Sequence, residues 1–159
     1  MTTDWIEPIF NREWWEAELI RLDPRNSNNR GSYNDTDLNR VENNTMWIRD
    51  LLSSVLGVDL SSMVIKTNWI MYDPSTETGD IPTLIDIERI RTNIETLQSF
   101  LSAIDFENII HDNTMNVEKA NILEKNLYLM EQNLINTYAR FYKCGTFLCG
   151  QNLLFGRRL

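Results

Sequence analysis

The sequence predicts a mainly α-helical protein: a small bundle of three to four helices with an extended N-terminal arm and an irregular or β-ribbon C-terminal tail. Three observations predict it. Apolar residues recur every three or four positions in separate segments, capping pairs precede two of them, and Gly or Pro falls between them. The 159 residues, with 10% aromatic side chains, suffice for one packed domain. We expect an arm over 1–10, a helical domain over 11–143 and a tail over 144–159.

The N-terminal region predicts the arm and one short helix. Pro8 keeps the first residues out of regular helix. A helix over 11–22 follows, with Asn11 as its cap and Glu13 in its first turn, where a carboxylate interacts favourably with the helix dipole. Its apolar stripe consists of Trp14, Trp15, Leu19 and Leu22. A polar loop over 24–33 separates this helix from the next.

Two longer helices begin at capping pairs. Asn34 with Asp37 opens the second helix, and Thr83 with Asp86 opens the third, directly after Pro82. Each then carries an apolar seam with helical spacing. The seam of the second helix is Leu38, Val41, Thr45, Ile48, Leu52 and Val55, and that of the third is Leu84, Ile87, Ile90, Ile94, Leu97 and Leu101.

Connectors of different character join these helices. Gly57 ends the second helix, and residues 61–82 predict a long connector laid over the helices and pinned by Trp69. A loop over 105–113 leads to a fourth helix over 116–143. Its seam is Ala120, Leu123, Leu127, Met130, Leu134, Tyr138 and Phe141. Such seams favour the shallow crossing angles of a bundle.

The composition excludes several classes of partner. A net charge of −8 and a pI of about 4.6 argue against nucleic acid, which requires clustered Lys and Arg, and against an anionic membrane. No apolar run approaches the ~20 residues that cross a bilayer, and no segment has the layout of a signal peptide. We therefore expect synthesis and folding in a cytoplasm, which is compatible with release inside a particle.

Few residues suggest chemistry. His111 is the single histidine and lies in a helix connection, which predicts a surface residue rather than a catalytic base. Asp35 and Asp37 form a DxD that is better explained as a helix start than as a metal ligand set. Cys144 and Cys149 are either a redox pair or, as we favour, two small apolar side chains. Phosphate-binding glycine motifs are absent from the sequence. The sequence predicts no enzyme, metal, cofactor or small-molecule substrate.

The aromatic and apolar residues at both ends are candidates for contacts between subunits. We expect Trp47 and Trp69 in the core, whereas Trp5 on the arm is evenly balanced between the core and an intersubunit contact. The interface candidates are Trp5, Ile6, Ile9 and Phe10 in the arm and Phe147, Leu148, Leu153, Leu154 and Phe155 in the tail.

Three stretches occur in a characteristic order: GSYNDTDLNRVE at 31–42, KTNW at 66–69 and DIPT at 80–83, followed by a doubled Cys-Gly unit in the tail. Together they resemble a module of tail-region structural proteins of phages and prophages of Gram-positive bacteria. The motif residues are Tyr33, Asn34, Asp37, Leu38, Arg40, Glu42, Lys66, Trp69, Pro82 and Thr83. The resemblance covers most of 30–150, departs from the pattern over 1–25, and implies no catalytic residues.

The motif residues also make sense as scaffold. Arg40 and Glu42 lie beside the core face of their helix, where we expect them to pair with the connector at 66–69. Asn39 lies in the first turns of that helix, where its amide is expected to bond to the connector backbone.

The resemblance implies a structural component of a phage tail or tail-like particle, in the baseplate, neck or fibre attachment. Such a protein joins copies of itself, as a symmetric homo-oligomer, or neighbouring particle proteins, here through the arm and the tail. The alternative is a small acidic helical adaptor or inhibitor that binds a basic partner. The scattered acidic residues favour the first hypothesis. A cell-wall glycan hydrolase is a third, since a catalytic carboxylate pair is a spatial arrangement that sequence does not reveal.

Overall fold

The computed structural model describes residues 4–22, 33–101 and 103–144, and for 19–21 and 138–144 it describes the backbone alone. This part is helical, and its four helices are α1 (Trp14–Leu22), α2 (Asp35–Leu56), α3 (Leu84–Gln98) and α4 (Val117–Cys144). Within it there is no β-strand, only two isolated bridges. The mainly α fold class is therefore confirmed. The prediction for the tail beyond Cys144 lies outside the described residues.

The capping residues define the predicted helix boundaries. The Asn34 side chain accepts a hydrogen bond from the Asp37 N–H, and the Asp37 carboxylate accepts one from the Asn34 N–H, both at 3.2 Å. Thr83 and Asp86 repeat this reciprocal arrangement at the start of α3. α2 ends at Gly57, whose φ of 66° is left-handed and therefore suits glycine. All three boundaries are confirmed.

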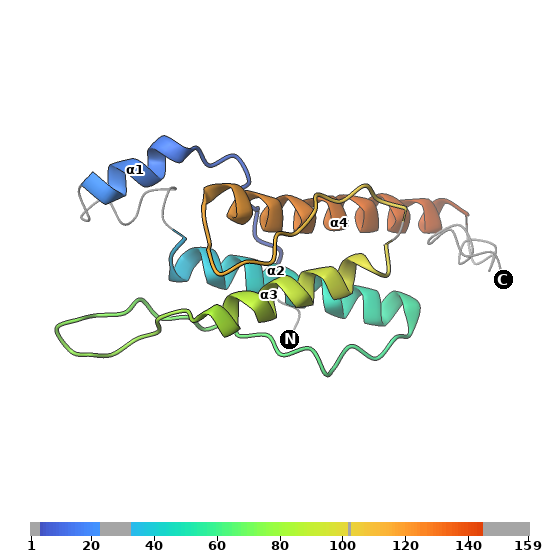
Figure 1. The fold of residues 1–159 in the computed structure, drawn as a ribbon. Coiled ribbons are helices and arrows are strands. Elements are labelled where there is room, and N and C mark those ends of the chain that lie inside the picture. The colour runs from blue at the N-terminus through green and yellow to red at the C-terminus, as the bar shows by residue number, and fades with distance from the viewer. Residues whose placement is uncertain (1–3, 23–32, 102, 145–159) are drawn as a thin grey trace.

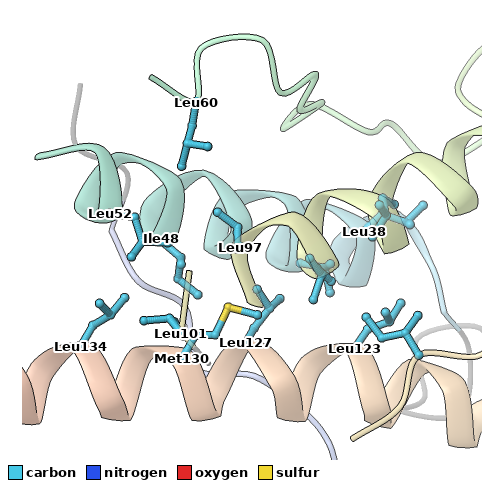
Figure 2. Packing of buried hydrophobic residues seen from close by; sticks show 14 of the residues in the cluster. Leu38, Ile48, Leu52, Leu60, Leu97, Leu101, Leu123, Leu127, Met130 and Leu134 are labelled. Carbon is cyan, nitrogen blue, oxygen red and sulfur yellow. The ribbon is translucent and has the colours of Figure 1, made fainter. Parts of the chain in front are cut away.

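The three long helices run in the same direction. Figure 1 shows α2, α3 and α4 side by side, each beginning at the end of the bundle where α1 lies. Figure 2 agrees, since Leu38 lies near Leu123 at one end and Leu52 near Leu134 at the other. Parallel neighbours require long returning connections, because short loops join antiparallel helices. The described residues of 57–83, 99–101 and 103–116 are non-helical and form these returns.

The core lies between α2, α3 and α4 and follows the predicted seams closely. Its buried members include Leu38, Val41, Ile48, Leu52, Ile87, Ile90, Ile94, Leu97, Ala120, Leu123, Leu127, Met130 and Leu134. Leu101 is also buried, although it lies beyond the end of α3. Leu84 contradicts its seam, because this first residue of α3 is 55% exposed. Side chains of Tyr138 and Phe141 lie outside the described residues.

The connector between α2 and α3 is pinned at Trp69, which is buried. The Asn39 amide accepts from the Trp69 N–H at 2.7 Å and donates to its carbonyl at 2.9 Å, which confirms the predicted bond to the connector backbone. The Lys66 ammonium lies 3.9 Å from the centre of a Trp69 ring and pairs with Asp80 at 2.5 Å. Residues 70–81 then project from the bundle as a loop (Figure 1), so only the first part of the connector lies over the helices.

The expected pairing of Arg40 and Glu42 with the connector is wrong. Arg40 points to α4, where it binds Glu124. Glu42 instead binds Arg89 of α3, with oxygen–nitrogen distances of 2.5 and 3.0 Å. Arg89 also donates to the carbonyl of Val64 at 2.9 Å, so Glu42 reaches the connector only through a third residue. Packing of the helices brings oppositely charged partners from α3 and α4 to both residues, and sequence proximity does not reveal these partners.

Candidate functional site

The N-terminal arm, residues 4–13, lies extended across α2 and α4 and runs three residues farther than predicted. The Asn44 amide of α2 donates to the Ile6 carbonyl at 2.6 Å and accepts from its N–H at 3.0 Å. Asn121 of α4 does the same for the backbone of Arg12, at 2.9 and 3.1 Å. Each side-chain amide thus pairs with both the N–H and the carbonyl of one arm residue, as a neighbouring strand does in a β-sheet.

Four charged residues form a buried ionic cluster beneath the arm. Arg12 binds Asp37 at 2.8 Å and Glu124 at 2.6 Å, while Arg40 binds Glu124 at 2.8 Å and also pairs with Asp37. The Glu124 carboxylate accepts a further bond from the Ile9 N–H. Two positive and two negative charges balance, which offsets the cost of burying them. The cluster therefore joins the arm, α2 and α4.

The buried charges shift the pKa of Arg40 within the cluster and of Tyr33 beside it. Burial opposes the charge on Arg40, but hydrogen bonds to Glu124 and Asp37 outweigh burial and raise the Arg40 pKa. Burial, reinforced by the negative charge of Glu124, raises the pKa of Tyr33 well above its ordinary value. The Arg12 guanidinium lies 5.5 Å from the centre of the Tyr33 ring. Arg40 and Tyr33 therefore keep their protons near neutral pH, and the cluster joins parts of the fold.

The arm residues predicted as intersubunit contacts mostly face their own chain. Three are half-buried, namely Trp5, Ile9 and Phe10, and Ile6 is exposed. The Trp5 ring packs on that of half-buried Trp47 at 5.3 Å, and Phe10 packs on Tyr128 at 5.1 Å. The arm is thus seated within the fold. The tail candidates Phe147, Leu148, Leu153, Leu154 and Phe155 lie outside the described residues.

His111 is a surface residue, as predicted, and bridges two carboxylates of α3. Its Nδ1 lies 2.5 Å from Glu88 Oε1 and its Nε2 lies 2.7 Å from Glu95 Oε1. Hydrogen bonds to Glu95 and then Glu88 raise the His111 pKa. The bridge ties the returning segment 99–116 to the outer face of α3.

A groove of about 960 Å³ runs along the outer face of α3. The connector residues 62–64 form one wall and the loop residues 111–113 form the other. Its apolar side chains are unusually open, since Ile85 is 81% exposed and Val64 is 66% exposed. No sequence prediction identified this groove, because its walls come from two connectors that are distant in sequence.

A second apolar surface lies on α1. Trp14 is 75% exposed, and Trp15 and Leu22 are exposed as well. Three residues of the stripe predicted for this helix therefore face outward, and the side chain of the fourth, Leu19, lies outside the described residues. Large exposed aromatic side chains are typical of surfaces that contact another protein.

In the described part of the chain, no group of three or more His, Cys, Asp or Glu side chains could hold a metal ion. None of the helices described is long and apolar enough to cross a bilayer.

Comparisons with known proteins identify no relative. No protein-family model matches the sequence, and neither the curated proteins nor the solved structures contain a match.

Proposed function

We propose that this protein is a structural assembly component that acts by binding copies of itself or neighbouring proteins. The observation that supports this function is exposed apolar surface at two places, around Trp14 on α1 and around Ile85 on α3, in a chain whose core is already closed. Soluble monomers rarely leave such large apolar side chains in contiguous exposed patches unless a partner covers them.

The proposed setting is a phage tail or tail-like particle. Its support is the order of the three sequence stretches around Asn34, Trp69 and Thr83, which resembles tail-region structural proteins. In this fold the motif residues serve as helix caps, core contacts and connector anchors. Motif residues with scaffold roles suit a protein whose function is its shape.

A second candidate function is that of an acidic adaptor for a basic partner. It is favoured by the exposed carboxylates of Glu88, Glu95 and Asp112 beside the groove. An adaptor of this kind would be a monomer that binds a positively charged protein with strong dependence on salt.

The solution mass of the full-length protein, measured by sedimentation over a wide concentration range, separates the two functions. Mass that increases with concentration, or a discrete oligomer, supports assembly. A monomer at every concentration argues against self-assembly and favours the adaptor. Removing the arm is a poor variant for this purpose, because Arg12 completes a buried cluster within its own chain; substitutions at the exposed surface are preferable.

A further inference from the structure

We infer that the groove along α3 binds the C-terminal segment 145–159 of a second copy, so that copies join head to tail. This inference rests on the proposed assembly function and names the two surfaces that would meet. Three features support it: the apolar floor of the groove, the acidic charge at its rim, and the composition of the segment.

The floor of the groove offers apolar contacts without a partner in the described part of its own chain. Val64 comes from the connector, while Leu84 and Ile85 come from the first turn of α3, and all three are more than half exposed. Covering them removes apolar surface from water, which favours association. Because they lie on a preformed helix and connector, little ordering is required when a partner binds.

The charges at the rim are arranged with carboxylates outward and cations inward. The side chains of Glu88 and Asp112 are 50% and 44% exposed, whereas Arg91 and Lys119, which pair with them, are 2% and 9% exposed. Hydrogen bonds from Lys119 and then from the Thr114 N–H lower the Asp112 pKa to about 2. An approaching segment therefore meets negative charge first.

The remaining charges facing the groove do not reverse this sign. Arg89 pairs with the buried Glu42 and donates a hydrogen bond to the backbone carbonyl of Val64. His111 is bridged by Glu88 and by Glu95, which adds a further exposed carboxylate. The groove thus suits an apolar segment that carries positive charge.

The C-terminal segment has that composition. Residues 145–159 contain no Asp or Glu and carry a charge of +2, from Arg157 and Arg158, whereas the whole chain carries −8. Five large apolar residues, Phe147, Leu148, Leu153, Leu154 and Phe155, precede the basic pair Arg157 and Arg158. Apolar side chains for the floor and guanidinium groups for the carboxylates of the rim thus occur in one segment.

The layout of the bundle favours a second copy over the same chain. The apolar floor lies at the beginning of α3, and Figure 1 shows that α4 ends at the opposite end of the bundle. In a neighbour placed in line, the groove end would therefore adjoin the end of α4 at Cys144. Repetition of this unlike contact produces a ring or a filament.

A mixing experiment with two full-length variants tests the inference. Ile85→Asp damages the groove and leaves the segment intact, while the double variant Arg157→Glu/Arg158→Glu damages the segment and leaves the groove intact. Each variant alone is expected to self-associate more than about tenfold more weakly than the parent, because charge is introduced against apolar or like-charged groups. An equal mixture should form a 1:1 dimer, since one intact groove meets one intact segment. Sedimentation velocity reports both results.

The matched control is Ile135→Asp, an exposed position on α4 outside the groove. It should leave self-association unchanged, and circular dichroism should show every variant to be as helical as the parent. A mixture that stays monomeric overturns the inference, because it shows that the segment does not bind the groove of another copy. Variants that associate like the parent also overturn it but leave assembly standing. A parent protein that is monomeric throughout overturns both.

Discussion

The backbone N–H of Ile9 donates a 2.6 Å hydrogen bond to the carboxylate of Glu124, a residue 115 positions later in the chain. The same carboxylate binds Arg12 of the arm and Arg40 of α2. One side chain of α4 thus binds three residues in two other parts of the structure, the arm and α2. The seat of the arm and the closure of the bundle depend on the same buried charge.

Replacing Glu124 with Gln should destabilise the fold strongly. The variant leaves Arg12 and Arg40 buried with only Asp37 to balance them, and an uncompensated buried charge costs about 3–5 kcal/mol. Urea unfolding followed by circular dichroism measures the change. Glu118→Gln, at an exposed position on the same helix, should change the free energy of unfolding by less than about 0.5 kcal/mol. Equal stability of the two variants would show that the cluster contributes little.

Replacing Asn44 with Ala should loosen the arm. The variant loses both hydrogen bonds to Ile6, at a cost of about 1–3 kcal/mol. Hydrogen exchange at the Ile6 N–H should accelerate, and Trp5 fluorescence should become more accessible to a quencher. Asn43→Ala, one position along α2, serves as the control and should change neither. Unaltered protection of Ile6 in Asn44→Ala would mean that other contacts hold the arm.

The His111 bridge should make stability depend on pH. Hydrogen bonds to Glu95 and Glu88 raise the pKa of His111 in the folded protein. The stabilisation that the bridge provides is therefore fully present below the unfolded pKa of about 6.5 and is lost as pH rises through the folded pKa. The pKa of Glu88 is lowered, chiefly by His111, so its contribution is lost as pH falls toward strong acid. His111→Gln should therefore cost more stability near about pH 6 than near about pH 9.

Thermal unfolding of the parent and His111→Gln at both pH values checks this expectation. Asn113→Ala, a change at an exposed and uncharged residue in the same loop, should produce the same effect at each pH. A cost of His111→Gln that does not vary with pH would indicate that the bridge does not form in solution.

Introducing charge into the core should abolish folding. Leu38, Ile48 and Leu127 are buried in the seams that join the three long helices, and an unpaired carboxylate at any of them must lose its hydration. Asp at each position should eliminate the helical signal and the cooperative melt. Ile135→Asp, at a position 46% exposed, should melt like the parent. A folded Leu127→Asp would show that the assigned core face of α4 is wrong.

Local signals predicted most of the helical fold. The pairs Asn34–Asp37 and Thr83–Asp86 specify helix starts within four residues of sequence, and both were correct. The prediction that Leu84 is buried was wrong, because apolar spacing does not reveal where a helix extends beyond the core. Periodicity is a property of one helix, whereas burial depends on its neighbours.

The ionic cluster and the groove were not predicted, for a different reason. Glu124 directly follows the core residue Leu123, and a charged residue so near a seam was the available signal of a buried pair. Its partner Arg12 is more than a hundred residues earlier, and sequence spacing does not connect them. The groove walls likewise meet only because both returning segments run beside α3.

The seating of the arm also determines when the protein matures in the cell. Ribosomes synthesise Ile9 long before Glu124, and at ordinary translation speeds the interval is on the order of ten seconds. Throughout that interval the nascent arm lacks its acceptor, and Arg12 remains hydrated. The bundle therefore closes only after α4 has been synthesised, and a chain truncated before Glu124 lacks the acceptor for the Ile9 N–H.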